Sequence, residues 1–382
     1  MKSKEFENFK MTIIHDWLVT LGGGEQILAA LLDVWPEAPI HTLVYDPHGP
    51  CAAFTEGKEI ETSFIQKLPG AKSNHRRYLP LMPLAIEQFD TRGYEVVISC
   101  SHAVAHGIIP QADQLHINYI CIPMRYAWHL YHQYLEETGL NSGFKGLFSK
   151  SILHYLRLWD ASAANRVDTF VAISQWVAQI VAKVYRRPAE VIYPPVNVLK
   201  FTPREDKENF YLTVSRAVPY KKLDLIVDAF TAMTEKKLVV ISDGPDLKKL
   251  MANAGNNIEF LGYQSQDTLI DCMQRARAFV FAAVEDFGIA PVEAQACGTP
   301  VIAFRKGGVL ETVVEDKTGI FFDKQTSQSL IKAIERFEHE EPRFDVNLMR
   351  NNAERFSKKR FEKEFREFVT IQWEQFKQKE AF

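Results

Sequence analysis

The stretch Met11–Val34, MTIIHDWLVTLGGGEQILAALLDV, decides the fold. It opens with a short apolar run, Met11–His15, which leads through a loop with three consecutive glycines into a segment of helical periodicity, Glu25–Val34. A buried strand that leads into a helix through a short loop is the repeating unit of a parallel sheet covered by helices on both faces. The stretch therefore predicts an α/β domain in the first half of the chain.

The same pattern begins again at Phe210–Val214, an apolar run that precedes a polar loop and the helical periodicity of Leu223–Phe230. Between the two halves, Tyr193–Asn197 contains two adjacent prolines, which lack an N–H donor and do not fit a central strand or a helix interior. The sequence thus predicts two doubly wound α/β domains joined at these prolines. Further buried strands are expected at Val96–Ser99, His116–Cys121, Thr169–Ile173, Lys237–Ser242, Ile258–Leu261, Ala278–Phe281 and Pro300–Phe304.

The composition is that of an ordinary soluble globular protein. Of the 382 residues, 46% are hydrophobic and 24% are charged, and the net charge is −3. Neither half carries the basic excess that neutralises nucleic-acid phosphates, so we do not expect nucleic acid as a partner. The polar start, MKSKEFENFK, differs from a secretory signal, and five cysteines without CxxC spacing are typical of reduced thiols. We therefore expect a cytoplasmic protein without a membrane-spanning helix.

Chemistry is concentrated in Glu285–Glu293, EDFGIAPVE, which follows the apolar run Ala278–Ala283. A loop that leaves the strand at Gly288 and enters a helix near Pro291 would present backbone N–H groups at a helix N-terminus, with Glu293 in the first helical turn. Two carboxylates and unpaired amides around one crevice can hold hydroxyl groups and an anion. The alternative is that both acids merely offset the helix macrodipole.

This segment resembles the E-x7-E pattern of the retaining glycosyltransferases of the GT4 type, with Glu285 and Glu293 at the two acidic positions. Other segments of the second half are similar to the family's signatures and follow in the expected order. The first half is most similar to WbaZ-like mannosyltransferases. The matching segments are Ser215–Lys221, Ser242–Pro245, Ala296–Ile302, Gly307–Glu311 and Gly319 in the second half, and His15–Leu18, Gly22–Glu25, Ser99–Ala105 and Pro123–Trp128 in the first.

The resemblance implies the GT-B fold, an α/β architecture of two facing Rossmann-like domains with a C-terminal helix that returns to the N-terminal domain. It assigns residues 1–196 to an acceptor-side domain, residues 197–362 to a nucleotide-sugar-binding domain and residues 363–382 to the returning helix. No cofactor and no metal are implied, because basic side chains and helix N-termini hold the diphosphate in this family. The sequence also has no HExxH helix and no DxD pair in the right context.

The roles that the resemblance implies agree with the chemistry of a nucleoside diphosphate sugar. Negative charge grows on the diphosphate as the glycosidic bond breaks, and Arg216 and Lys221 would stabilise that charge. Glu293 would hold the ribose hydroxyls, and Glu285 with nearby amides would hold the sugar. The implied catalytic residues are Arg216, Lys221 and Glu285; the donor-binding residues are Gly23, Gly24, Asp243, Gly244, Gly262, Phe287, Gly288, Ile289, Ala290 and Glu293; and the residues on the acceptor or sugar side are Asp16, His102, Cys121 and Arg125.

The glycine run Gly22–Gly24 follows the first strand, where open α/β sheets place their ligands. Glycine permits close backbone approach and positive φ. Ile27 occupies the third glycine position of the GxGxxG fingerprint, which disfavours a dinucleotide. We therefore expect this run to approach the donor phosphates and the acceptor, and a merely flexible turn is the alternative.

One position departs from the family pattern. Where many members carry a histidine that faces the donor sugar, this chain has Cys121, and a thiol is a weak hydrogen-bonding group. Either a neighbour such as His102 or His129 supplies the contact, or the sugar position it faces needs none. We favour the neighbour; the second possibility predicts that a 6-deoxy sugar donor is used at least as well as mannose.

The segment Gly143–Trp159, GFKGLFSKSILHYLRLW, mixes aromatic and aliphatic residues with Lys145, Lys150 and Arg157. It fits an amphipathic helix docked on its own domain, which is the interpretation we favour. It also fits an interfacial segment that contacts the inner face of a membrane near a lipid-borne substrate. Peripheral membrane contact is therefore a secondary hypothesis.

Taken together, the sequence predicts a metal-independent retaining glycosyltransferase that moves a hexose onto a glycan or a lipid-linked acceptor, with mannose from GDP-mannose favoured. One alternative is a nucleotide-sugar epimerase of the same fold, which an assay without acceptor would distinguish. The other is a non-catalytic nucleotide-sugar-binding partner, which the presence of Arg216, Lys221, Glu285 and Glu293 disfavours.

We expect Arg216→Ala and Lys221→Ala each to lower kcat/KM at least about tenfold, equivalent to roughly 1.4 kcal/mol of transition-state stabilisation. Each substitution removes a positive charge from the departing diphosphate. Steady-state kinetics of the folded variants measures the effect. Near-native kinetics for both variants would contradict the assignment of the diphosphate site.

Overall fold

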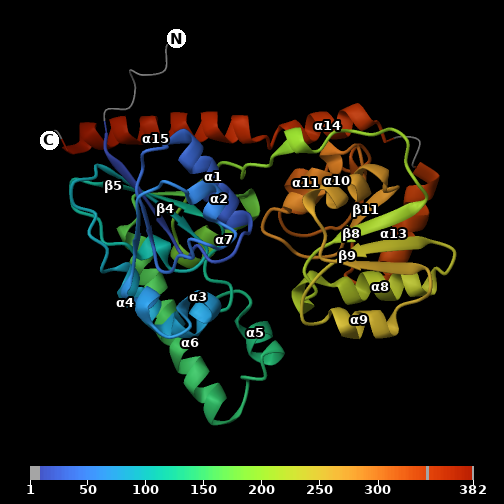
Figure 1. The fold of residues 1–382 in the computed structure, drawn as a ribbon, viewed down its shortest axis with the longest axis horizontal. Coiled ribbons are helices and arrows are strands. Elements are labelled where there is room, and N and C mark those ends of the chain that lie inside the picture. Colours follow the sequence, from blue (N-terminus) through green and yellow to red (C-terminus); the bar gives the residue numbers. More distant parts are fainter. Residues whose placement is uncertain (1–8, 341–343, 381–382) are drawn as a thin grey trace. The chain divides into compact units, whose positions relative to one another are not determined.

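The computed structural model describes residues 9–340 and 344–380. The chain divides into two compact units. Unit 1 comprises Met1–Pro195 together with Phe361–Phe382, and unit 2 comprises Val196–Arg360. In each unit a central sheet is flanked by helices (Figure 1). Among the described residues, no helix is long and apolar enough to cross a membrane.

In the described part of unit 1, seven parallel strands form one sheet in the order β3-β2-β1-β4-β5-β6-β7. The chain moves outward from β1 to β3 and then crosses back to β4, which pairs with the other side of β1. The strand order therefore reverses between β1 and β4. The strands are β1 (Met11–His15), β2 (Ile40–Thr42), β3 (Ile60–Thr62), β4 (Val96–Ser101), β5 (Leu115–Ile120), β6 (Thr169–Ala172) and β7 (Ala189–Val191).

The crossovers of unit 1 are mostly helical, as parallel strands require. The longest α-helices among them are α1, α6 and α7. The α-helices are α1 (Gly23–Val34), α2 (Ala52–Thr55), α3 (Ala71–Asn74), α4 (Met82–Ile86), α5 (Tyr131–Glu137), α6 (Gly143–Ala163) and α7 (Gln175–Tyr185), and the 3-10 turns are η1 (Phe64–Lys67), η2 (His75–Leu81), η3 (Ala105–Gly107) and η4 (Ala164–Arg166).

Unit 2 repeats this plan with six parallel strands among its described residues, in the order β10-β9-β8-β11-β12-β13. Here the strand order reverses between β8 and β11. The strands are β8 (Phe210–Val214), β9 (Lys237–Ile241), β10 (Ile258–Gly262), β11 (Ala278–Phe281), β12 (Val301–Phe304) and β13 (Gly319–Phe322); the helices are η5 (Val198–Lys200), η6 (Pro219–Lys221), α8 (Leu223–Ala232), α9 (Leu247–Asn253), α10 (Gln266–Arg275), α11 (Ile289–Ala296), α12 (Val309–Thr312), α13 (Ser327–Glu340) and α14 (Val346–Glu354).

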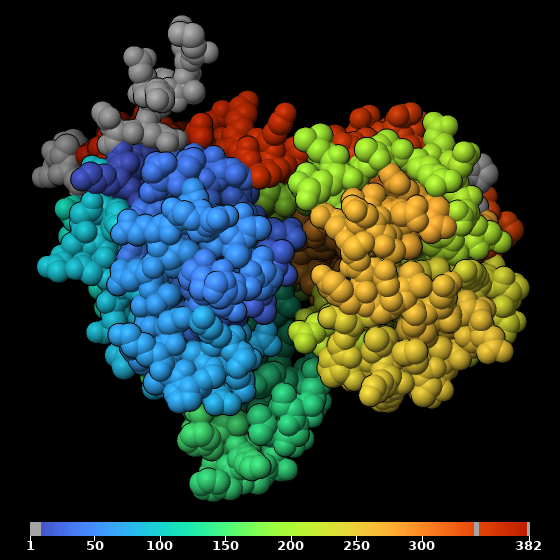
Figure 2. Space-filling view, in the orientation of Figure 1, coloured from blue at the N-terminus to red at the C-terminus, as the bar shows by residue number. Residues whose placement is uncertain are grey.

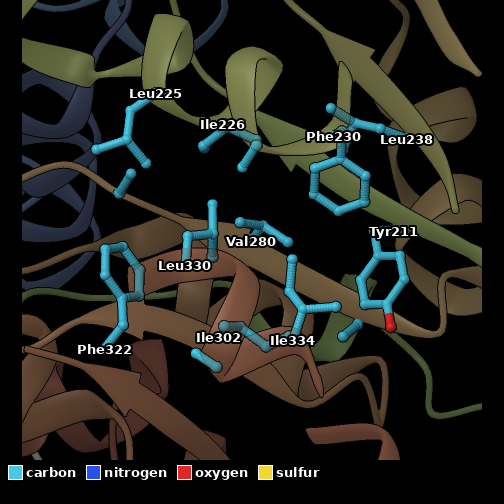
Figure 3. Close-up of a cluster of buried hydrophobic side chains, with 14 of the residues drawn as sticks. Tyr211, Leu225, Ile226, Phe230, Leu238, Val280, Ile302, Phe322, Leu330 and Ile334 are labelled. Carbon is cyan, nitrogen blue, oxygen red and sulfur yellow. The ribbon is translucent and has the colours of Figure 1, made fainter. Parts of the chain in front are cut away.

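The core of unit 2 fixes the loop that follows β8. Figure 3 shows Phe230 of α8, Val280 of β11 and Leu330 of α13 converging on one buried cluster. Tyr211 of β8 packs its ring 5.2 Å from that of Phe230. Because α8 and β8 are both held in this core, the loop between them has two fixed ends.

The last helix, α15 (Lys358–Glu380), completes unit 1. Phe361 and Phe365 are fully buried and pack edge-on against Tyr119 of β5, with ring centroids 5.7 and 5.4 Å apart. Phe365 also meets Trp35, at the end of α1, at 6.0 Å, and Arg366 donates to the Val34 carbonyl at 3.0 Å. In Figure 1, α15 accordingly lies along the sheet of unit 1. The predicted α/β class with two Rossmann-like sheets and a returning C-terminal helix is confirmed.

The strands that the sequence predicts are present, to within one or two residues at their ends. Four further strands, β2, β3, β7 and β13, were not predicted. The first three have three residues each, and the outer pair, β3 and β7, are only partly buried, so they lack a long apolar run. The segment Gly143–Trp159 is indeed helical, as the main part of α6.

We expect Phe365→Ala to lower the free energy of unfolding by about 3–5 kcal/mol, because it leaves a cavity between α15 and the sheet of unit 1. Ile371→Ala, on the same helix and half exposed, is the matched control and should cost less than about 0.5 kcal/mol. Urea denaturation measures both. If the two variants were equally stable, α15 would not be packed as described.

Candidate active site

In unit 2, two loops leave the sheet at the carboxyl ends of β8 and β11, on either side of the point where strand order reverses. Ligands of open α/β sheets bind in the crevice that opens at such a point, because the adjoining loops turn to opposite faces of the sheet. Lys221 lies on the loop after β8, and Glu285 lies on the loop after β11. Their side chains form an ion pair, both partly buried. Two of the predicted catalytic residues thus meet at the expected place.

Two glycines, Gly307 and Gly308, pack directly against the backbone of the loop that carries Glu285. The Gly308 N–H donates to the Glu285 carbonyl at 2.8 Å, and Glu285 pairs with Gly307 as an isolated bridge. Gly307 has φ of 87°, and a Cβ there would lie 2.5 Å from the Glu285 carbonyl oxygen. A Cβ on Gly308 would lie 2.4 Å from the Asp286 carbonyl oxygen. Only glycines allow the loop to approach this closely, so they position the Glu285 carboxylate.

Helix α11 begins earlier than the sequence suggests. Gly288, with φ of 91°, is its N-cap, and Ile289 is its first residue. Pro291 therefore lies inside the first turn. Glu293 is the fifth helical residue, in the second turn, which corrects the prediction of a first-turn position. The N–H groups around Gly288–Ala290 lie at the helix N-terminus, as predicted.

Glu293 is a partly buried carboxyl group whose side chain makes no hydrogen bond or ion pair with another described residue. Burial raises its pKa to about 7. The predicted donor residue Phe287 is buried, and its ring packs 5.3 Å from that of Phe356. The buried ring of Phe287 therefore anchors the loop before α11. Only the backbone groups of Phe287 are left to contact a ligand.

The other predicted donor residues of unit 2 lie along the same edge of the sheet. Arg216, after β8, is exposed and has no ion-pair partner among the described residues. The Ala217 N–H donates to the Asp243 carbonyl after β9 at 2.5 Å, which joins the two loops. Gly244 has φ of 120°, and a Cβ there would lie 2.8 Å from the Ala217 carbonyl oxygen. Gly262, with φ of 70°, ends β10 farther along the edge.

Unit 1 brings Asp16 and His102 together at its own reversal of strand order, between β1 and β4. The N–H groups of residues 102 and 103 donate to Asp16 Oδ2 at 2.7 and 2.9 Å, and those of residues 104 and 105 donate to Oδ1 at 2.6 and 2.8 Å. Asp16 is fully buried, so it holds the loop after β4 from beneath. Burial by itself favours the neutral carboxyl, but the His102 charge and the amide donors keep the pKa of Asp16 below its usual value.

His102 is the partly exposed end of this arrangement, with 29% of its side chain accessible to solvent. Its Nδ1 lies 3.1 Å from Asp16 Oδ2, and its ring packs edge-on against Trp17 at 4.6 Å. Burial holds the pKa of His102 below its usual value even though the Asp16 carboxylate opposes the shift. A neutral imidazole beside a carboxylate carries its proton on Nδ1, which leaves Nε2 as an acceptor for a ligand hydroxyl.

The glycine run of unit 1 is ordered helix rather than flexible turn. Gly22 is the N-cap of α1, and Gly23 and Gly24 are its first two residues. The Gly22 N–H donates to Glu25 Oε2 at 2.7 Å, so the side chain of the third helical residue satisfies the N-cap donor. None of the three glycines has positive φ, so the run does not depend on that freedom of glycine. A Cβ on Gly24 would lie 3.6 Å from His102 Nδ1, so the run does pass close to the site.

Two residues near His102 were missed as candidates, although they lie in the stretches HDWL and GGGE that carried the resemblance. His15 and Glu25 are buried, with His15 Nε2 3.8 Å from Glu25 Oε1. Neither ring nitrogen of His15 has a hydrogen-bond partner among the described residues. Their polar character inside an apolar strand and helix was the available signal.

Cys121 follows β5 and is partly exposed; its N–H donates to the Ser101 carbonyl at 2.8 Å. Its thiol lies near that of Cys100, and this contact, with burial, raises the pKa of Cys100. Arg125 is partly buried on the following loop, and His129 is exposed farther along it. Two histidines were offered as a replacement at this position. Among the described residues, His102 contacts Asp16 at the β1–β4 reversal of strand order, whereas His129 does not.

Among the described residues, no group of three or more His, Cys, Asp or Glu side chains is arranged to hold a metal ion.

Two protein families match this chain in succession. Residues 21–199 match the family described as Glycosyltransferase Family 4, and residues 198–360 match the family described as Glycosyl transferases group 1. Together the two family models span residues 21–360, so each half of the chain matches a glycosyltransferase family.

Curated glycosyltransferases are similar to parts of this chain. It is 31% identical over 203 residues to the uncharacterized glycosyltransferase MJ1178 of Methanocaldococcus jannaschii, a match that covers 52% of this chain and 56% of that protein. It is also 31% identical over 180 residues to a GDP-mannose-dependent monoacylated alpha-(1-6)-phosphatidylinositol monomannoside mannosyltransferase of Corynebacterium glutamicum, covering 39% of this chain and 47% of that protein. The chain thus spans about half the length of these relatives.

Among solved structures, Anabaena Alr3699/HepE in complex with UDP and glucose is similar to this chain, with a TM-score of 0.69 and 17% sequence identity. The match covers 95% of this chain and 100% of that chain. At this identity the likeness establishes the fold, and it confirms the predicted GT-B class.

We expect Glu293→Gln to raise the thermal stability of the protein at about pH 8. Because burial raises the pKa of Glu293 from 4.5 to about 7, the wild-type folded state loses stability as the pH rises through about 7, where the buried carboxyl must ionise. An amide avoids that cost. Calorimetric melting should show a higher Tm for the variant at about pH 8 and similar values at about pH 5. Equal pH dependence of the two proteins would contradict the raised pKa.

If Glu293 holds the ribose, as the resemblance implies, the same substitution should weaken the binding of GDP, because an amide oxygen accepts ribose hydroxyls less well than a carboxylate. Glu285→Gln is the matched comparison. It releases Lys221 from its ion pair, so GDP affinity should not fall, whereas turnover should. Titration calorimetry with GDP measures both variants, and equal losses of affinity would exclude this division of roles.

Proposed function

We propose that this protein is a retaining hexosyltransferase that transfers mannose from GDP-mannose to a glycan or a lipid-linked saccharide, without a metal ion. The matches of both halves to glycosyltransferase families support the reaction class. The GDP-mannose dependence of the Corynebacterium relative supports the donor. The similarity of Pro123–Trp128 to WbaZ-like mannosyltransferases supports the sugar.

The ion pair between Lys221 and Glu285 at the β8–β11 reversal is the observation that carries the proposal. The pair places a cation, Lys221, beside a carboxylate that can accept hydrogen bonds from hydroxyl groups, Glu285. A nucleoside diphosphate sugar presents a phosphate next to sugar hydroxyls, so it needs these two groups side by side. A bound donor replaces both halves of the pair: a phosphate oxygen takes Lys221, and sugar hydroxyls take Glu285. A nucleoside diphosphate sugar is therefore complementary to the site.

Arg216 supplies the second cation of the proposed reaction. It is exposed at the end of β8 and close in sequence to Lys221, on a loop whose two ends are fixed by the core of unit 2. As the bond between the sugar and the diphosphate breaks, negative charge grows on the leaving oxygen. Fixed cations stabilise that charge without reorganising, which lowers the barrier.

Retention of configuration follows when the acceptor approaches from the side of the leaving group. In the proposed step the bond between the anomeric carbon and the phosphate oxygen breaks, and the acceptor hydroxyl oxygen bonds to the same face of that carbon. The departing phosphate oxygen takes the acceptor's proton. Arg216 and Lys221 stabilise the phosphate, and no side chain needs to act as the base.

In unit 1, His102 replaces the histidine that the family carries at the position of Cys121. The contact with Asp16 leaves His102 Nε2 as an acceptor for a sugar hydroxyl, whereas the Cys121 thiol is a weak hydrogen-bonding group. With His102 in this role, the protein can bind the sugar of a hexose donor although Cys121 stands at the family's histidine position.

A thermal-shift screen with GDP-, UDP-, ADP- and TDP-sugars tests the donor, because a ligand at about 100 times its Kd stabilises the folded state by roughly 2.7 kcal/mol. We expect GDP-mannose to give the largest shift. A transfer assay with GDP-mannose, GDP-rhamnose and TDP-rhamnose then tests the sugar, and a reaction without acceptor serves as the control for epimerisation.

In that assay, His102→Ala should reduce turnover of GDP-mannose, while Cys121→Ser and His129→Ala should remain close to wild type. A clear preference for a 6-deoxy donor would overturn the choice of mannose. Product formed without any acceptor would overturn the transferase reaction itself.

A further inference from the structure

Helix α6 carries apolar residues on two opposite faces. One face packs against unit 1 through Leu153 and Leu156, which are buried in a core shared with Met82 and Ile86. The opposite face bears the apolar stripe of α6, which we define as Phe144, Leu147, Phe148, Tyr155 and Leu158.

The stripe is exposed to solvent over its whole length. Phe144, Leu147, Phe148 and Leu158 have exposed fractions of 86, 65, 62 and 61%, respectively. Its members are spaced so that they lie on one side of a helix with 3.6 residues per turn. Single exposed apolar residues are ordinary, but a continuous stripe of this kind marks an interaction site. The packing of unit 1 does not use it.

The surface beside the stripe is basic. The sequence contains no acidic residue between Glu137 and Asp160, while Lys145, Lys150 and Arg157 lie in that interval. Lys150 and Arg157 each donate to a backbone carbonyl, and neither forms an ion pair with a carboxylate of the described residues. Asp160 itself is fully buried and accepts hydrogen bonds from Trp128 and Tyr185.

A second basic segment packs against α6, with Met82 and Ile86 of α4 in one core with Leu153 and Leu156. Residues 62–86, which include α3 and α4, contain no acidic residue and carry Lys67, Lys72, Arg76 and Arg77. Leu84 is exposed there as well. Figures 1 and 2 show this light-blue segment beside the green α6, which protrudes at one end of unit 1. Positive charge and exposed apolar side chains are thus concentrated in one region of a chain whose net charge is −3.

We propose that the apolar stripe of α6 inserts into the interface of an anionic lipid bilayer. The aromatic and leucine side chains enter the boundary between headgroups and acyl chains, and Lys145 lies against the lipid phosphates. Lys67, Arg76 and Arg77 of the neighbouring segment add positive charge, whereas Lys72 pairs with Asp46 at 3.4 Å. A helix with an apolar face, flanking cations and no exposed acid is the composition that lies in such an interface.

The charges favour a lipid surface over a second copy of this chain. In a two-fold symmetric dimer built on the stripe, Lys145 and its basic neighbours would face their own copies, and like charges would repel. A surface of anionic headgroups instead offers a countercharge to every cation at once. This inference concerns unit 1 alone and does not depend on the proposed sugar donor.

Co-sedimentation of the full-length protein with vesicles tests the inference. One set of vesicles contains phosphatidylcholine alone, and the other also contains phosphatidylglycerol. We expect binding to the anionic vesicles, weaker binding to the neutral ones, and a decline with added salt. Phe144→Ser/Phe148→Ser should lower the partition coefficient at least about tenfold, and Lys145→Glu should lower it at least about fivefold on anionic vesicles only.

The matched controls are Leu199→Ser/Met251→Ser, which removes exposed apolar side chains of unit 2, and Lys332→Glu, which reverses an exposed charge there. Both should bind as the wild type does, and all variants should keep the wild-type Tm because the altered side chains are exposed. Equal binding by Phe144→Ser/Phe148→Ser and wild type would overturn the proposal. Absence of binding would also overturn it, and gel filtration would then show whether the stripe instead joins two copies or leaves a monomer with a surface suited to another protein.

Discussion

Crossovers between parallel strands are almost always right-handed, and this constraint creates both candidate sites. When the chain moves from the first strand toward one edge and later returns to build the other, the helices after the two central strands cover opposite faces of the sheet. The loops between them must part at the carboxyl edge. In unit 2 this brings Lys221 to Glu285, which is 64 residues away along the chain, and in unit 1 it brings the amide of His102, 86 residues away, to Asp16.

The elements around these sites could be predicted from sequence because their signals are local. β1 and β8 are apolar runs, and α1 and α8 have clear helical periodicity. The contact between Lys221 and Glu285 could not be predicted in this way, since it depends on strand order, which no single strand encodes. The start of α11 was misplaced for a related reason. The helix was expected to begin near Pro291, but Gly288, with positive φ, is its N-cap and the helix begins two residues before Pro291.

The surroundings of Asp16 could not be predicted from residue chemistry. The carboxylate after the first strand accepts hydrogen bonds from the backbone amides of residues 102–105. Every residue except proline has a backbone N–H, so the sequence does not show which of these groups donate to Asp16. Helix α6 presented the opposite difficulty. Its sequence is apolar on both sides, and only the packed structure shows that Leu153 and Leu156 face inward while Phe144 and Phe148 face solvent.

The return of α15 to unit 1 has a consequence for synthesis on the ribosome. Tyr119 and Trp35 are covered by Phe361 and Phe365, which are translated only after all of unit 2. At about 5–20 residues per second, the first domain waits on the order of ten seconds or more with this surface uncovered. The residues of unit 2 are contiguous, so unit 2 is fully translated before the last helix of unit 1 is made. The half that is made first is therefore the half that is finished last, and its uncovered aromatic side chains are the surface that chaperones would meet in the interval.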